Sequence, residues 1–154
     1  MIDQREIRGL MIPVTNGRVL LPNASVAEVI TLSTPDKIPN APEWLMGRVA
    51  WRGWRIPLFS FSLLAGMALD EGSRGTRVTV LKALGGYQRM PFIAMLAQGF
   101  PRLTTLSPEV LVPSSDSMPT RPGVLMNVMV RDDQAVIPDL GQIELLISQS
   151  LAAA

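Results

Sequence analysis

The stretch Ala41–Gly66, APEWLMGRVAWRGWRIPLFSFSLLAG, decides how the rest of the chain is interpreted. Two short apolar runs, Gly47–Trp51 and Trp54–Phe59, meet there at the dipeptide Arg52-Gly53. Apolar runs on either side of a tight, glycine-containing turn are typical of a β-hairpin. We therefore expect a central hairpin that carries tryptophan and arginine side chains around its turn.

The remaining sequence repeats this pattern of short apolar runs separated by turn residues. With 13 prolines and 12 glycines, the chain is poorly suited to a helical bundle and favours many short strands. We expect hairpin turns at Asn16-Gly17, Gly85-Gly86 and Asp132-Asp133. The further strands are expected at Ile7–Val14, Arg18–Leu21, Val26–Leu32, Arg77–Leu84, Tyr87–Ala97, Leu103–Leu106, Val124–Val130 and Ala135–Ile137.

Helical signals are few and fall in three places. Ser60 is positioned to cap a short helix over Phe61–Ala65, which Gly66 would end. Pro42 suits the start of a single helical turn through Met46. A longer helix is expected after Pro138-Asp139, because apolar residues recur there at helical spacing, at Leu140, Ile143, Leu146 and Leu151. The proline-rich range 108–122 is expected to be a loop.

These elements predict a mostly β fold, in one domain over residues 7–151 with flexible ends at 1–6 and 152–154. The chain of 154 residues is long enough to bury its own core. One or two small barrels, completed by the C-terminal helix, are the simplest arrangement of seven or more short strands.

The composition excludes several classes of function. The chain has no cysteine and no histidine, which removes disulfides, thiolate metal sites and the commonest general base. A formal net charge of +1 is too small for a strong nucleic-acid footprint. No apolar run reaches the ~18 residues of a membrane span, and the N-terminus lacks a signal-peptide core, so we expect a cytoplasmic protein.

Catalytic motifs are absent from the sequence. The adjacent acids Asp70-Glu71 and Asp132-Asp133 lie in polar turns and are expected to face solvent. No serine occupies a nucleophile elbow, and the glycine pairs are not followed by the lysine and helix of a phosphate-binding loop. We expect no enzymatic activity and no cofactor; a carboxylate-only enzyme would require a pocket with two converging acids.

The hairpin has three interpretations that the residues leave open. Trp51 and Trp54 could fill a core, with Arg48, Arg52 and Arg55 solvated. They could instead form a stacking surface for single-stranded nucleic acid. The third interpretation is a protein-contact surface, because tryptophan and arginine are typical interface anchors.

Glu28 lies in an otherwise apolar strand, and its carboxylate must either face solvent or pair with a cation. Arg52 is one candidate partner. The sequence leaves this pairing open.

In their order and spacing, these motifs resemble the CheW-like domain of bacterial chemotaxis adaptors, over nearly the whole chain. The motif set contains a strand glutamate, a proline-rich loop, a Pro-x-Trp-Leu-x-Gly segment, an Arg-Gly turn and a strand with a hydrophobic-Pro-Leu ending. The matching segments are Val26–Val29, Pro39–Pro42, Pro42–Gly47, Arg52-Gly53, Arg55–Leu58, Phe61–Gly66 and Leu106–Glu109.

The resemblance implies two small SH3-like five-stranded barrels around one hydrophobic core, with no catalysis. It implies an adaptor that joins the regulatory domain of a CheA-type histidine kinase to the cytoplasmic tips of methyl-accepting chemoreceptors. Carried over to this chain, the strand glutamate is Glu28, the turn arginine is Arg52, and Gly47 lies near the same receptor-facing groove. With their neighbours, the expected partner-binding residues are Glu28, Gly47, Arg48, Arg52, Gly53 and Arg55.

Two departures from the family pattern suggest a subtype. The range Pro91–Ala97 lacks the acid that usually follows a valine there, and Trp51 replaces an aliphatic residue before the Arg-Gly turn. These changes resemble the ChpC- and PilI-type adaptors of chemosensory systems that control type IV pili and twitching.

Overall fold

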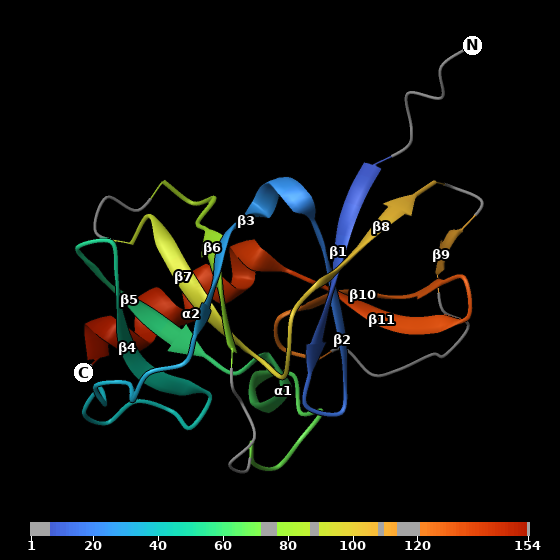
Figure 1. The fold of residues 1–154 in the computed structure, drawn as a ribbon. Coiled ribbons are helices and arrows are strands. Elements are labelled where there is room, and N and C mark those ends of the chain that lie inside the picture. The colour runs from blue at the N-terminus through green and yellow to red at the C-terminus, as the bar shows by residue number, and fades with distance from the viewer. Residues whose placement is uncertain (1–6, 72–76, 87–89, 108–109, 114–120, 154) are drawn as a thin grey trace.

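The computed structural model describes residues 7–71, 77–86, 90–107, 110–113 and 121–153. It is mostly β, with two sheets, a short helix and a C-terminal helix (Figure 1). The elements are β1 (Ile7–Val14), β2 (Gly17–Pro22), the 3-10 turn η1 (Asn23–Ser25), β3 (Val26–Thr31), β4 (Leu45–Trp51), β5 (Trp54–Phe59), α1 (Phe61–Leu64), β6 (Arg77–Lys82), β7 (Phe92–Ala97), β8 (Arg102–Leu106), β9 (Leu111–Pro113), β10 (Val124–Val130), β11 (Asp133–Pro138) and α2 (Leu140–Ala153).

The six-stranded sheet, here called the first barrel, combines the two ends of the chain. Its strand order is β8-β1-β2-β11-β10-β9, and the contact between β2 and β11 is its one parallel pairing. The blue β1 and β2 therefore lie beside the orange β10 and β11 in Figure 1. The interior of this barrel contains Met11, Leu20, Leu106, Val128, Val130 and Ala135.

The five-stranded sheet, the second barrel, comes from the middle of the chain. Its strand order is β3-β6-β7-β5-β4, so β3 and β4 are its opposite edges. The central hairpin β4–β5 supplies one of these edges. The interior of the second barrel is lined by Val49, Trp51, Ile56, Leu58, Val78, Val80, Ala94 and Leu96.

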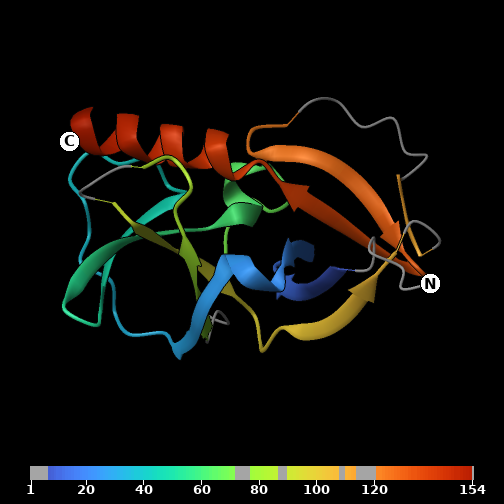
Figure 2. The same cartoon turned by 90° about the horizontal axis from the view of Figure 1, so that it is seen from above.

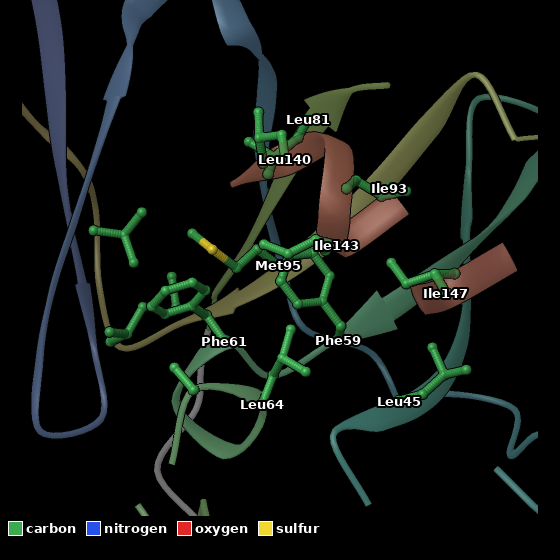
Figure 3. Close-up of a cluster of buried hydrophobic side chains, with 14 of the residues drawn as sticks. Leu45, Phe59, Phe61, Leu64, Leu81, Ile93, Met95, Leu140, Ile143 and Ile147 are labelled. Atoms are coloured by element: carbon green, nitrogen blue, oxygen red, sulfur yellow. The ribbon is translucent and has the colours of Figure 1, made fainter. Parts of the chain in front are cut away.

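A third apolar cluster joins the two barrels to α2. Phe59 and Phe61, on either side of the α1 N-cap, are fully buried in it, together with Ile143 and Ile147 of α2 (Figure 3). Figure 2 shows α2 leaving the end of β11 and lying across the second barrel. The fold is therefore two SH3-like barrels with a shared core, as expected, although the first sheet has six strands where five were expected.

Most expected elements are present, with few changes of boundary. Ser60 caps α1 by accepting a hydrogen bond from the backbone N–H of Leu63 at 3.1 Å, and Gly66 follows with φ 71°. The return strand expected from Tyr87 begins at Phe92, and residues 87–89 lie outside the described part. The expected flexible segment 1–6 lies outside it too, whereas α2 continues to Ala153.

Two local expectations were wrong. Pro42 starts no helical turn through Met46, because β4 begins at Leu45 after a turn closed by the Leu45 N–H and the Pro42 carbonyl at 3.0 Å. The range 108–122, expected to be a loop, contains β9, whose residues pair with β10.

The expectation for Glu71 was also wrong. Its carboxylate accepts hydrogen bonds from the hydroxyls of Thr15 and Ser60 instead of facing solvent. Gln98 donates to Thr15 Oγ1 at 2.8 Å, so the network joins the β1–β2 turn to the N-cap of α1. Its neighbour Asp70 is exposed, as expected.

Glu144 is a buried carboxylate that the helical pattern did not indicate. It lies on α2 among apolar residues and is fully buried. Its oxygens accept hydrogen bonds from the backbone N–H groups of Leu84 at 2.9 and 3.0 Å and of Gly85 at 2.7 Å. The carboxylate thereby ties the helix to the segment that follows β6.

Candidate functional site

The turn of the central hairpin has the backbone that its sequence predicts. Trp51 pairs with Trp54, and the two residues between them, Arg52 and Gly53, have φ values of 49° and 80°. Positive φ at both central residues is characteristic of a type I′ turn. Glycine adopts this region freely, whereas for Arg52 it costs roughly 1–2 kcal/mol. The fold therefore holds an arginine in a position where glycine, asparagine or aspartate is usual.

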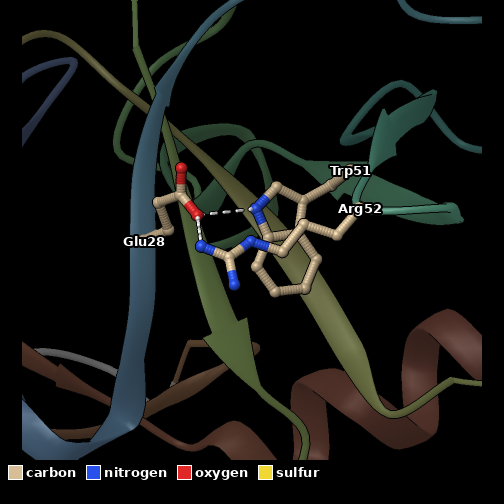
Figure 4. A network of polar contacts seen from close by, with 3 residues as sticks. All are labelled: Glu28, Trp51 and Arg52. Carbon is tan, nitrogen blue, oxygen red and sulfur yellow. Dashed lines mark hydrogen bonds and ion pairs between the residues drawn. The ribbon is translucent and has the colours of Figure 1, made fainter.

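Glu28 of β3 connects this turn to the opposite edge of the barrel (Figure 4). Arg52 Nη2 donates to Glu28 Oε1 at 2.7 Å, and the indole Nε1 of Trp51 donates to the same oxygen at 3.2 Å. Since β3 and β4 are not hydrogen-bonded neighbours, these two contacts bridge the gap between the sheet edges. The pairing that the sequence left open is present and helps to close the second barrel.

Trp51 has a packing role as well as this polar one. Its side chain is buried in the interior of the second barrel, and its ring meets Phe92 edge-on with centroids 4.7 Å apart. The Arg52 guanidinium lies 5.2 Å from the ring centroid, within the range of a cation–π contact. Trp51 thus contacts both partners of the ion pair, a role that none of the three interpretations of the hairpin had included.

The exposure of the ion pair limits how much it stabilises the fold. The side chains of Arg52 and Glu28 are 70% and 37% exposed. An ion pair this open to water contributes about 0.2–1 kcal/mol. Its larger effect is to fix the direction of Arg52, whose remaining N–H donors face solvent.

Gly47 is required by a close backbone contact. The Asp36 N–H donates to the Arg48 carbonyl at 2.9 Å, and the Arg48 N–H donates to the Asp36 carbonyl at 2.8 Å. A Cβ on Gly47 would lie 2.5 Å from that Asp36 oxygen, at a φ of 143°. The loop containing Asp36 therefore covers part of the free edge of β4, and this packing depends on the glycine.

Arg48 and Arg55 share one face of the hairpin. Arg55 pairs across the strands with Ala50, and Arg48 precedes Ala50 by two residues, so both side chains point to the same side. Arg55 forms an ion pair with the Asp36 carboxylate. Arg48 has no ion pair or side-chain hydrogen bond with any described residue. The hairpin carries three arginines, two of them held by carboxylates.

Gly53 differs from Gly47 in its surroundings. No atom lies within 4 Å of the position that a Cβ would take on Gly53. The six expected partner-binding residues are therefore not one cluster: Glu28 and Arg52 touch directly, Gly53 completes their turn, and Gly47, Arg48 and Arg55 are organised around Asp36.

The described residues give little support to the other interpretations. Two surface pockets on this part of the chain are lined by no aspartate or glutamate, and no group of three or more metal-ligating side chains occurs among the described residues. Of the two hairpin tryptophans, only Trp54, 42% exposed, presents much surface on which a base could stack.

Two SH3-like barrels with a shared core and an ion-paired hairpin turn define a small two-barrel β domain. The model of the CheW-like domain matches residues 8–145, so the chain belongs to the CheW-like domain family. As a member of this family, the chain has a scaffold or adaptor function in chemotaxis-type signalling and no enzymatic activity.

The structure is also similar to the crystal structure of the scaffolding protein TtCheW from Thermoanaerobacter tengcongensis. The TM-score is 0.70 at 18% sequence identity, covering 87% of this chain and 84% of that chain, which shows a shared fold. None of the curated protein sequences matches this chain. Within the described ranges, none of the helices has the length and apolar character needed to cross a membrane.

Proposed function

We propose that this chain joins the cytoplasmic tips of methyl-accepting chemoreceptors to the regulatory domain of a CheA-type histidine kinase. The single observation that supports the receptor contact is the fixed direction and exposure of the Arg52 side chain. Glu28 and the Trp51 ring fix its direction, yet 70% of its side chain is exposed. An oriented, exposed guanidinium with free donors suits contact with a partner's carboxylates or carbonyls.

The mechanism is bivalent binding. One barrel edge pairs with a barrel of the kinase, while the groove beside the hairpin holds a receptor helix pair. Holding both partners on one rigid domain raises the effective concentration of each for the other. The shared core supports this coupling, because Phe59 and Phe61 pack both barrels into one unit.

We further propose that the domain spans residues 7–151, works in the cytoplasm, and belongs to a system controlling type IV pili and twitching. The subtype rests on the Trp51 substitution and on the range Pro91–Ala97, which has no acid. In the structure Trp51 contributes the indole N–H to Glu28, so an aliphatic residue there would remove one of the two contacts. Co-purification with a pilus-system kinase tests the subtype.

The receptor contact is tested by Arg52→Glu, with Arg131→Glu as the matched control. Both arginines lie in hairpin turns with positive φ, 49° and 56°, but in different barrels. Receptor capture from cell extract should fall about tenfold or more for Arg52→Glu, because a repulsive charge replaces an oriented cation at the interface. Arg131→Glu should bind like the wild type, and equal capture by all three proteins would contradict the assignment.

A further inference from the structure

The two barrels are joined by hydrogen bonds at the end of their junction where the β1–β2 turn meets α1, in the lower part of Figure 1. The Ser62 hydroxyl of α1 donates to the Thr15 carbonyl of this turn at 2.6 Å. The backbone N–H of Gln98, directly after β7, donates to the Pro13 carbonyl of β1 at 2.8 Å. Since β7 belongs to the second barrel and β1 to the first, this N–H forms a hydrogen bond between the barrels.

The carboxylate of Glu71 is bonded to both sides of this junction, through separate oxygens. Its Oε1 accepts from the hydroxyl of Thr15, in the β1–β2 turn of the first barrel. Its Oε2 accepts from the hydroxyl of Ser60, between β5 and α1 on the side of the second barrel. Ser60 is fully buried, so its hydroxyl needs a partner within the protein. One carboxylate therefore connects the two barrels.

The directions of these two hydrogen bonds are set by the other partners of the hydroxyls. The Leu63 N–H donates to Ser60 Oγ at 3.1 Å. The side-chain N–H of Gln98 donates to Thr15 Oγ1 at 2.8 Å. Since N–H groups only donate, each hydroxyl accepts there and directs its own hydrogen to Glu71. A chain of hydrogen bonds thus arrives from each barrel at one negative charge, and bonds in such chains strengthen one another.

The described residues offer Glu71 no counter-ion. The residue is partly buried and forms no ion pair within the described ranges. A partly buried carboxylate without a cation depends on its hydrogen-bond donors. Leu69, two positions earlier, is 96% exposed, so apolar packing does not fix this end of the segment after α1. The hydroxyls of Thr15 and Ser60 therefore hold Glu71 in place, and Glu71 in turn holds them together.

We propose that Glu71, with Thr15, Ser60 and Gln98, forms an inter-barrel clamp that fixes the orientation of the first barrel relative to the second. The shared apolar core keeps the barrels in contact, but hydrophobic burial is non-directional, whereas hydrogen bonds require defined distances and angles. The clamp deepens the proposed function and its consequence rests on that function, because bivalent coupling needs both partner surfaces at one orientation. Glu71 is thus a positioning residue that contacts neither partner.

The clamp is tested by amide hydrogen exchange of the full chain, measured by NMR. In Glu71→Ala the Gln98 N–H should exchange about tenfold faster or more, because its acceptor lies in the other barrel and the junction opens more often. Amides within β1 and β7 should keep their rates. Glu71→Gln, which retains one carbonyl acceptor, should be intermediate. Asp70→Ala removes the exposed neighbouring acid and should behave like the wild type.

A second variant removes the clamp from the side of the first barrel. Thr15→Val replaces the hydroxyl with a methyl group at nearly the same volume, and it should accelerate the same amide. It decides the question if Glu71→Ala does not fold. An unchanged Gln98 rate in the folded variants would overturn the proposal. So would an equal acceleration of the β1 and β7 amides, which would mean a general loss of stability, or an equal effect of Asp70→Ala.

The consequence for coupling is measured separately, by capture from cell extract. Glu71→Ala should capture receptor and kinase singly like the wild type, whereas kinase captured together with receptor should fall about threefold or more. Full joint capture by a variant with fast Gln98 exchange would contradict the link to coupling. Failure of the wild type to capture either partner would contradict the proposed function alone, since the exchange measurement does not depend on it.

Discussion

Each barrel has an ion pair between an edge strand of its sheet and a hairpin, and the charges are exchanged between the two barrels. In the second barrel the acid Glu28 is on the edge strand β3 and Arg52 is in the hairpin turn, 2.7 Å apart. In the first barrel Arg102 is on the edge strand β8 and Asp133 begins the hairpin strand β11, 2.9 Å apart. The exposures are nearly equal, 70% and 37% against 66% and 38%.

What differs is the surroundings of the two ion pairs. Beside Glu28 and Arg52 lies the buried Trp51, which donates to the same carboxylate oxygen and lies close to the arginine. In the first barrel, the turn residue Arg131 donates to the Thr104 hydroxyl at 3.3 Å and forms no ion pair with a described residue. The two turn arginines therefore differ: Arg52 is held by an ion pair and lies beside a buried ring, whereas Arg131 takes no part in the ion pair of its barrel.

The largest expected effect on stability comes from removing the Trp51 side chain, which distinguishes the surroundings of the second barrel's ion pair. Trp51→Ala should destabilise the protein by about 3–5 kcal/mol, because a large buried ring and its contact with Phe92 are lost. Urea unfolding measures this change. Trp54→Ala is the control: its side chain is 42% exposed and its loss should cost well under half as much. Equal costs would mean that Trp51 does not organise the second barrel.

An intermediate effect is expected at the two glycines of the hairpin. Gly47→Ala should cost about 2–3 kcal/mol, since the new methyl group would meet the Asp36 carbonyl in a strained backbone conformation. Gly53→Ala faces open space and should cost only about 1 kcal/mol, from its positive φ. Thermal unfolding of both variants gives the ratio; a larger loss for Gly53→Ala would contradict the packing described for Asp36.

The smallest effect is expected for neutralising each ion pair. Glu28→Gln and Asp133→Asn should each cost about 0.2–1 kcal/mol, because both pairs are exposed to solvent. High salt should reduce both differences from the wild type, by screening the charges. Denaturant midpoints at low and high salt provide the measurement. A loss of several kcal/mol for either variant would show that the pair is far less hydrated than its exposure indicates.

The sequence predicted the local features of the site better than its long-range contacts. Arg52-Gly53 was placed correctly in the turn, because the signal is contained in neighbouring residues. The partner of Glu28 stayed open, since their contact depends on the curvature that brings β3 near the hairpin. Glu144 was missed because its partners, the backbone N–H groups of Leu84 and Gly85, lie about 60 positions away. Neither the type of side chain nor its spacing in the sequence predicts a carboxylate that accepts hydrogen bonds from backbone N–H groups.

A similar limit applies to β9. Its three residues carry little strand signal of their own, and their pairing with β10 is tertiary. The Asp132-Asp133 prediction failed in part for the same reason. Asp133 begins β11 and pairs with Arg102 of β8, although its sequence position beside Asp132 suggested a solvent-facing turn.

The central claim is that Arg52 contacts a partner in addition to closing the barrel, and exchanging the charges separates the two roles. The double variant Glu28→Arg with Arg52→Glu keeps an ion pair between the same positions but reverses the charge at the turn. Thermal unfolding and receptor capture are measured on this variant, on both single variants and on the wild type. The account predicts that the exchange recovers the unfolding temperature while receptor capture stays reduced about tenfold or more. Recovery of capture together with stability would contradict it and leave Arg52 with a structural role only.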